Sequence, residues 1–354
     1  MSVKKLLWTV CCLTLASCSL IDDEVYKEGN DYELDYELRL VTNMTTELQT
    51  QLSAETELSL AQSLRAQLSQ IFTDFAHDVD LSFYDTVGDS LRLQHDEHIM
   101  DANQASYTLN LPKRQYMHLA AANIVDDKLV DLVDDERCHR AKIVLLQGNT
   151  RSAVDGLPVD NIIDSHSTGI FTARQLMEVL EGVDQQFNVH LYMANCASVL
   201  VVDTVGSSVK DMKVFTTGFA TGFNVADSSY IFVDNPPLVR TTPITGYDNG
   251  EMAFCSVTFP SRDVARTRTI IETTDPFVSP YSDESLWEIH VYAIAPDESI
   301  TLTKLFIRHP LRAGQLMIIK VRAKDDGSVI PIDPTVGFLV VLDWSDGGSH
   351  VIPL

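Results

Sequence analysis

The stretch Val79-Asp80-Leu81-Ser82-Phe83-Tyr84 decides the fold class, because apolar residues alternate along it with more polar ones. Successive side chains of a β-strand point to opposite faces, so this alternation predicts a half-buried strand. The residues Val87-Gly88-Asp89-Ser90 favour a turn, and Leu91 and Leu93 resume the alternation. The segment as a whole therefore predicts a β-hairpin.

The rest of the first half carries more strand-like sequence and one helix. Strands are expected at 37–41, 107–111, 116–122 and 143–146. Pro112 ends the second of these, since proline cannot donate to a ladder. Over 53–76 the period changes: Leu60, Leu64 and Leu68 recur every four residues, which predicts an amphipathic helix that begins at Ser53.

The second half reads as β-sequence with one further short helix. Residues 148–170 are rich in Gly, Ser, Asp and Thr, so we expect a domain boundary there. Thr172-Ala173-Arg174-Gln175 resembles a capping box and predicts a short helix that Gly182 closes. Strands are then expected at 189–193, 199–203, 212–216, 230–233, 254–259, 287–294, 300–307, 315–323 and 336–344. Short strands at this density predict antiparallel β-sandwiches.

Length and charge narrow the class of protein. A chain of 354 residues is long for one core, so we expect two domains, at 34–150 and 151–354. The formal net charge is −24, and no compact basic patch is visible. Such a surface repels phosphate backbones, so nucleic-acid binding is not expected.

The first eighteen residues have the layout of a secretory signal peptide. Lys4 and Lys5 precede a short apolar core at 6–15, which is too brief to span a bilayer. The sequence Leu15-Ala16-Ser17-Cys18 resembles a bacterial lipobox, which implies cleavage between Ser17 and Cys18 and a lipid on Cys18. The alternative is an ordinary signal peptide followed by a chance cysteine. Residues 1–17 are thus the expected signal peptide.

A polar, acidic tether is expected at 18–33. The acidic run Asp22-Asp23-Glu24 resembles the export signal of surface lipoproteins in the Bacteroidales, and a simple solvated tether is the alternative.

The three cysteines of the chain body are Cys138, Cys196 and Cys255. Three is an odd number, so at most one pair can form within the chain. Cys196 and Cys255 lie in strand-like sequence and could be neighbours, but three buried free thiols are the preferred interpretation. Their spacing is not that of a metal site.

Three clusters of polar residues are candidate chemical sites, and none forms a convincing site. The run His95-Asp96-Glu97-His98 packs four possible metal ligands into loop-like sequence. Ser165 and His166 are neighbours in sequence, and such neighbours rarely form a nucleophile–base pair. The acidic run 126–136 lacks the regular spacing of a calcium loop, and a solvated helix or loop is expected there. We therefore expect no catalytic residue, no metal site and no cofactor.

Several segments, taken in order, resemble one known family. They are Cys18 with its acidic tether and the segments 38–41, 78–85, 109–112, 116–123 and 337–344. Together they resemble the FimB-type anchor, or minor-subunit, lipoproteins of type V fimbriae in the Bacteroidales. The first half matches this family better than the second.

The resemblance implies two transthyretin-like antiparallel β-sandwich domains, the first with one inserted helix. It implies a lipid-anchored, surface-exposed protein of the outer membrane that terminates a fimbria and tethers it. The implied partners are a major fimbrial subunit, bound by strand addition, and outer-membrane lipid. Pilin precursors of this type are trimmed near their first strand, close to the position of Arg39. Cleavage there would remove the lipid, so Arg39 is not expected to be a processing site.

Two other functions are compatible with a β-rich surface protein. A surface adhesin that binds a glycan or a host protein could use the same fold, because sandwiches host many functions. A glycan site would need exposed aromatic side chains, whereas Trp287 and Trp344 lie in apolar strand sequence that suggests core packing. A secreted enzyme is disfavoured because no catalytic constellation was found.

Overall fold

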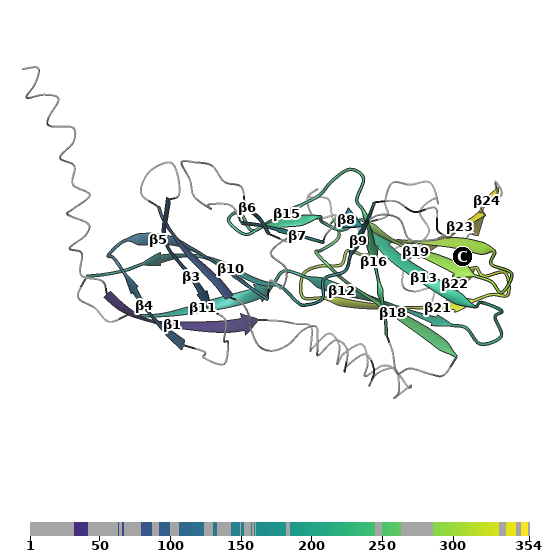
Figure 1. The fold of residues 1–354 in the computed structure, drawn as a ribbon, viewed down its shortest axis with the longest axis horizontal. Helices are drawn as coiled ribbons and strands as arrows, with labels where there is room; N and C mark the ends of the chain where they lie inside the picture. Colours follow the sequence, from purple (N-terminus) through teal and green to yellow (C-terminus); the bar gives the residue numbers. More distant parts are fainter. Residues whose placement is uncertain are drawn as a thin grey trace, which may run out of the picture.

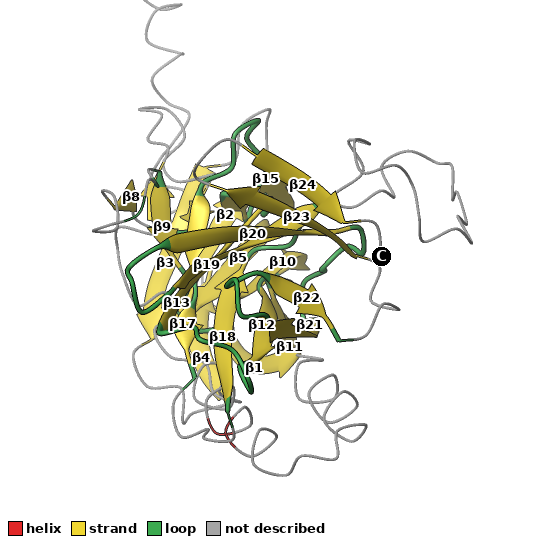
Figure 2. Ribbon diagram, turned by 90° about the vertical axis from the view of Figure 1, so that its right-hand side faces the viewer, coloured by secondary structure: helices red, strands yellow, loops and turns green. Residues whose placement is uncertain are grey.

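The computed structural model describes 32–41, 63, 66, 79–86, 92–99, 106–123, 130–132, 143–148, 150–151, 157, 159, 161–181, 185–244, 250–262, 286–332, 338–344 and 348–352. Within these ranges nearly all regular structure is strand, drawn in yellow in Figure 2. The all-β prediction is confirmed. Ser63 and Ala66 are helical, and the rest of the helix expected at 53–76 lies outside the described residues. Among the described residues, no helix is long and apolar enough to cross a bilayer.

The first sandwich is built from one seven-stranded sheet in the order β3-β2-β5-β10-β11-β1-β4. Neighbouring strands pair antiparallel except β1 and β11, which run parallel. The strands are β1 (Tyr32–Val41), β2 (Val79–Asp85), β3 (Arg92–Ile99), β4 (Ser106–Leu111), β5 (Gln115–Ala122), β10 (Phe171–Glu178) and β11 (Gln185–Met193).

The sheet divides into two layers where β10 meets β11. These two strands pair only at Phe171↔Met193 and Thr172↔Tyr192, whereas β10 pairs with β5 over its whole length. Side chains of β2, β5 and β10 share one buried cluster with those of β11. The layers β3-β2-β5-β10 and β11-β1-β4 thus enclose a sandwich core, at the left of Figure 1.

The second sandwich pairs a five-stranded sheet with an eight-stranded sheet. The first has the order β17-β18-β12-β21-β22, with β12 (Cys196–Asp203), β17 (Thr242–Pro243), β18 (Glu251–Thr258), β21 (Leu316–Ala323) and β22 (Val329–Pro331). The second has the order β24-β23-β20-β19-β13-β16-β9-β8, with β8 (Thr150–Arg151), β9 (Ile162–Asp164), β13 (Asp211–Thr217), β16 (Leu238–Arg240), β19 (Trp287–Ile294), β20 (Ile300–Ile307), β23 (Phe338–Trp344) and β24 (Gly348–Ile352).

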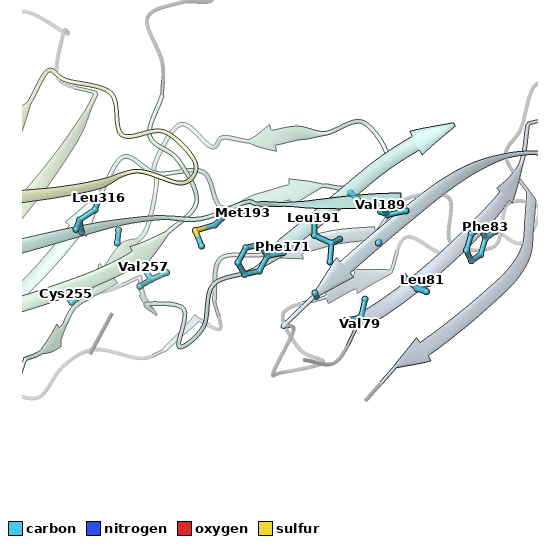
Figure 3. Packing of buried hydrophobic residues seen from close by; sticks show 14 of the residues in the cluster. Val79, Leu81, Phe83, Phe171, Val189, Leu191, Met193, Cys255, Val257 and Leu316 are labelled. Carbon is cyan, nitrogen blue, oxygen red and sulfur yellow. The ribbon is translucent and has the colours of Figure 1, made fainter. Parts of the chain in front are cut away.

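The central strand of the five-stranded sheet, β12, is buried on both faces. Leu200 and Val202 of β12 pack with Trp287 and other side chains of the eight-stranded sheet. Val199 and Val201, which point the other way, belong to the cluster that runs into the first sandwich. This explains why β12 is a nearly continuous apolar run instead of an alternating one. Figure 3 shows the shared cluster from Phe83 at one end to Leu316 at the other.

A four-stranded sheet covers the outer face of the first sandwich. It has the order β15-β14-β7-β6, with β6 (Val130–Leu132), β7 (Ile143–Leu146), β14 (Gly222–Asn224) and β15 (Ser229–Ile231). Its Leu145 and Phe223 pack with Tyr84 of β2 and Leu119 of β5. Figure 1 shows this sheet alongside both sandwiches.

Most strand predictions are confirmed, including the hairpin of β2 and β3 and the bounds of β19 and β20. The short helix expected from Thr172 is wrong, because these residues form β10 and Gly182 lies outside the described residues. The capping-box residues are local signals, and pairing along β5 overrides them. Within the acidic run 126–136, Val130–Leu132 form β6 instead of the expected helix or loop, since they pair with β7.

Strand pairing crosses the domain boundary expected at residues 150 and 151. β10 and β11 lie beyond it but pair with β5 and β1 of the first sandwich. Conversely, β8 begins at Thr150 and belongs to the eight-stranded sheet. We propose that the main passage between the sandwiches is the short link Ala194–Asn195 between β11 and β12, because the strands on its two sides belong to different sheets.

Candidate functional site

β1 is the first described element that follows the predicted lipid site in the sequence. Ser17 and Cys18 lie outside the described residues, as does the tether up to residue 31. β1 then begins at Tyr32 and is held on both sides. It pairs in parallel with β11 from Leu34↔Gln185 to Val41↔Tyr192, and antiparallel with β4 from Tyr32↔Leu111 to Glu37↔Ser106.

This position determines how β1 can resist force. Hydrogen bonds of a ladder run across the strands, so a pull along β1 loads many of them together. A force applied at the N-terminal side would therefore be shared by the bonds to β11 and β4. Arg39 lies within the paired part of β1, opposite His190 of β11. The expectation that the chain is not processed at Arg39 stays a prediction.

The histidine-rich run expected in a loop is instead part of a strand. His95 to His98 lie in β3, where they pair with Phe83 to Asp80 of β2. The loop prediction failed because these polar residues gave no strand signal and only the partner strand reveals it. No cluster of three or more His, Cys, Asp or Glu suited to a metal occurs in the described part of the chain.

The structure places the hydroxyl of Ser165 and the ring of His166 in different hydrogen bonds. The Ser165 hydroxyl accepts from the backbone N–H of Val257 at 2.8 Å. The His166 ring lies elsewhere, edge-on to Phe259 with ring centroids 4.9 Å apart. The two neighbours therefore do not form a nucleophile–base pair with each other.

His166 instead forms a buried polar network with Asn195. Its Nε2 lies 3.0 Å from the carbonyl oxygen of Leu146, and its Nδ1 lies 2.6 Å from Nδ2 of Asn195. Oδ1 of Asn195 accepts from the backbone N–H of Ile170 at 2.5 Å. A neutral ring that donates from Nε2 to Leu146 and accepts at Nδ1 from Asn195 fits both of its contacts. Asn195 then keeps its Oδ1 for the N–H of Ile170. Burial lowers the pKa of His166 to about 4, in agreement with the neutral form.

Gln147 ties the same region to β18. Its amide donates to the carbonyl of Val257 at 3.2 Å and accepts from the N–H of Phe259 at 2.7 Å. The hydroxyl of Tyr230 donates to Ala194, next to Asn195, at 2.9 Å. We call these hydrogen-bonded groups the junction network. Because they come from segments far apart in sequence, the network fixes the link between the sandwiches.

The two described thiols are structural. Cys196 and Cys255 are free and buried. Cys255 lies opposite Val199 in the ladder, whereas Cys196 lies opposite Thr258, so the two are not neighbours. Burial raises the pKa of each thiol to about 12, which keeps both as unreactive thiols. The preference for free thiols agrees with this, while Cys138 lies outside the described residues.

A cavity of about 900 Å³ opens on the outer face of the eight-stranded sheet. Tyr292 and His290 are buried at its base, and Oε2 of Glu288 lies 2.8 Å from Nε2 of His290. Asn161 and Glu298 line it with left-handed backbone conformations, at φ of 56° and 67°. For Glu298 this conformation belongs to the turn between β19 and β20, where its N–H donates to the carbonyl of Ala295 at 3.0 Å.

A second cavity of about 510 Å³ lies where β10 and β11 separate. Arg174 and Gln175 of β10 and His190 and Tyr192 of β11 line it, together with Tyr230 of the small sheet. Tyr192 is 57% exposed. Sequence reasoning missed both cavities, because their lining residues come from strands that only the tertiary structure brings together.

Comparison with known proteins gives matches among solved structures alone. No family model and no curated protein matches the chain. Among solved structures, it is similar to a candidate polysaccharide-binding protein of Bacteroides thetaiotaomicron, with 10% identity, a TM-score of 0.48, and coverage of 91% of this chain and 99% of that one. It is also similar to a fimbrial assembly protein of Parabacteroides distasonis, with 11% identity, a TM-score of 0.39, and coverage of 92% and 99%.

A third similar structure is a candidate cell adhesion protein of Bacteroides eggerthii, with 12% identity and a TM-score of 0.45. The match covers 89% of this chain and 97% of the other protein.

Proposed function

We propose that this chain is a cell-surface lipoprotein that acts as an anchor or accessory subunit of a fimbria. In this role it terminates the polymer and tethers it to the outer membrane through lipid on Cys18. The lipobox-like sequence at 15–18 and the resemblance of the tether and strand segments support the proposal.

The structural observation that supports an anchor is the position of β1. An anchor must transmit force from the membrane to the body of the protein. β1 begins at Tyr32, within the last two residues of the expected tether, and is paired with both β11 and β4, so its ladders can carry that force. A strand at the edge of the sheet would be held on one side only.

The test replaces the predicted lipid acceptor, Cys18→Ala, in the bacterium that makes the protein. Labelled palmitate uptake reports lipidation, and fimbrial polymer is measured on cells and in the medium. We expect label to be lost and fimbriae to be shed or to grow abnormally long. If label is lost while fimbriae remain attached and normal, the anchor role is wrong. Cys12→Ala, in the predicted signal peptide, is the matched control and should change neither readout.

A surface adhesin is the second candidate function, and the 900 Å³ cavity favours it. Its lining combines amide, carboxylate, imidazole and ammonium groups with Tyr292, and these groups supply the hydrogen-bond donors and acceptors that sugar hydroxyls need. Binding of the purified chain to a glycan array, abolished by Asn235→Ala and Lys304→Ala, would support this role. An array without any binding would count against a glycan ligand.

A further inference from the structure

The last residues of β10 present a free sheet edge. One side of β10 pairs with β5 from Phe171↔Ala122 to Glu178↔Gln115. The other side pairs with β11 only as far as Thr172↔Tyr192. Among the described residues, no strand pairs with this second side beyond Thr172. A strand edge of this kind is a template for another strand.

The direction of the backbone groups on this edge follows from the hydrogen bonds at its two ends. The carbonyl of Ile170 accepts from Ala194 at 2.8 Å, and the carbonyl of Glu178 accepts from the side chain of Gln185 at 3.2 Å. Both therefore point toward the β11 side. Backbone direction alternates along a strand, so the N–H and C=O groups of Arg174 and Leu176 point to that side as well.

The exposed face of this edge carries a self-complementary pattern. Arg174, Leu176 and Glu178 point outward and are exposed, with Leu176 at 61%, while Ala173 and Met177 point into the core. An apolar residue thus lies midway between a cation and an anion.

We propose that a second copy of this chain pairs antiparallel with β10 across this edge. In the symmetric arrangement Leu176 lies opposite Leu176 of the second copy, and Arg174 lies opposite Glu178. In all three pairs, the backbone N–H and C=O groups of both residues point toward the other copy. Each pair can therefore form the hydrogen bonds of an antiparallel ladder. The contact is isologous, as is usual for two-fold dimers.

Charge selects this register over its neighbours. Pairing centred on Arg174 places two cations opposite each other, and pairing centred on Glu178 places two anions opposite each other. Like charges directly opposite are destabilising, whereas opposite charges stabilise a cross-strand pair. The register centred on Leu176 places opposite charges together twice and buries Leu176 between them. The carbonyl of Glu178 must exchange its bond to Gln185 for one to the second copy.

This inference goes beyond the proposed function and does not depend on it. An anchor that ends a fimbria and a free-standing adhesin could each pair in this way. The dimer would join two four-stranded layers, β3-β2-β5-β10, into one sheet of both copies.

A cysteine at the two-fold axis tests the contact directly. Hydrogen-bonded residues of an antiparallel pair have Cα atoms about 5.5 Å apart, within the range that a disulfide spans. Leu176→Cys in the full chain, on intact cells treated with a mild oxidant, should therefore give a covalent dimer on a non-reducing gel. Val205→Cys is the matched control, because Val205 is 67% exposed and lies away from this edge. It should give only the background level of dimer.

Charge reversal separates this register from chance collision. In the Leu176→Cys chain, Glu178→Arg places cations opposite each other and should reduce cross-linking by about tenfold. The double change Arg174→Glu with Glu178→Arg restores opposite charges and should restore cross-linking.

The cysteine variant could misfold, so the same charge variants are also made with Leu176 retained. Sedimentation of the full chain in detergent then compares their oligomeric states. Glu178→Arg should sediment as a monomer under conditions where the native and doubly changed chains are dimeric. Cross-linking of Leu176→Cys no greater than that of Val205→Cys would overturn the proposal. So would a native chain that sediments as a monomer at every concentration tested.

Discussion

At the scale of single residues, burial determines the chemistry of the polar side chains. His118 stacks on Phe83 with ring centroids 4.3 Å apart, and its Nδ1 lies 3.1 Å from the carbonyl of Ser82. His166 is buried in the junction network. Burial lowers the pKa of both rings from 6.5 to about 4. Both are therefore neutral in the fold at pH values where an unfolded chain would begin to bind protons.

These two histidines predict loss of stability in acid. Between pH 6.5 and about 4 the unfolded state binds protons that the folded state does not, so the free energy of unfolding falls as pH falls through this window. Each ring should account for roughly 3 kcal/mol across the full window. Urea unfolding at pH 7, 6, 5 and 4 measures the effect.

A glutamine at 166 removes the titrating ring while keeping a donor and an acceptor. His166→Gln should reduce the pH dependence of the unfolding free energy, while His118 retains its own share. An unchanged slope in His166→Gln would show that this ring is not buried in its neutral form.

At the scale of elements, pairing on both sides distinguishes β1 from an edge strand. β1 has partners in β11 and β4, so a break within it should disturb both neighbours. The ion pair between Arg114 and Asp85, with Nη1 and Oδ2 2.6 Å apart, connects the ends of β5 and β2 on the other layer. This ion pair adds to the ladder that joins β2 and β5.

Tyr36→Pro tests the role of β1 in the sheet. Tyr36 lies opposite Phe187 of β11 and Tyr107 of β4, and proline in a central strand removes a ladder hydrogen bond. We expect faster amide exchange in β11 and β4, measured by hydrogen–deuterium exchange. Tyr36→Phe keeps the backbone donor and should retain native protection. Equal protection in Tyr36→Pro would mean that β1 contributes little to the sheet.

At the scale of the whole molecule, the two sandwiches share apolar and polar contacts. The apolar cluster from Phe83 to Leu316 runs through both sandwiches. The small sheet packs with Tyr84 and Leu119 of the first sandwich. The junction network reaches the end of β18 in the second sandwich. We infer that the sandwiches stabilise each other.

This shared core predicts one cooperative unfolding transition at pH 7. Calorimetry should show a single peak for the native chain, with calorimetric and van't Hoff enthalpies in agreement. Asn195→Ala removes the acceptor of the Ile170 N–H and the donor to His166, so it should lower the midpoint of that peak without splitting it. Two well-separated peaks for the native chain would contradict the shared core.

The sequence determined the strands whose signal is local. In β2 the two-residue period identified a strand, and β19 and β20 were predicted to the residue. Alternation of the more apolar side chains indicates a strand without knowledge of the partner, although both faces of β2 are buried in the fold. The lipobox-like residues at 15–18 are likewise a local signal.

Only the tertiary structure decided the strands and sites that depend on a partner. Residues 172–182 carry the start and stop signals of a helix, yet residues 171–178 form β10 because eight residues of β5 pair with them. His95 to His98 become strand for the same reason, through β2. The junction network and both cavities join residues separated by tens of positions, and the free edge of β10 exists because β11 turns away into the other layer. These features arise from non-local pairing and burial, which the sequence pattern of a single segment does not encode.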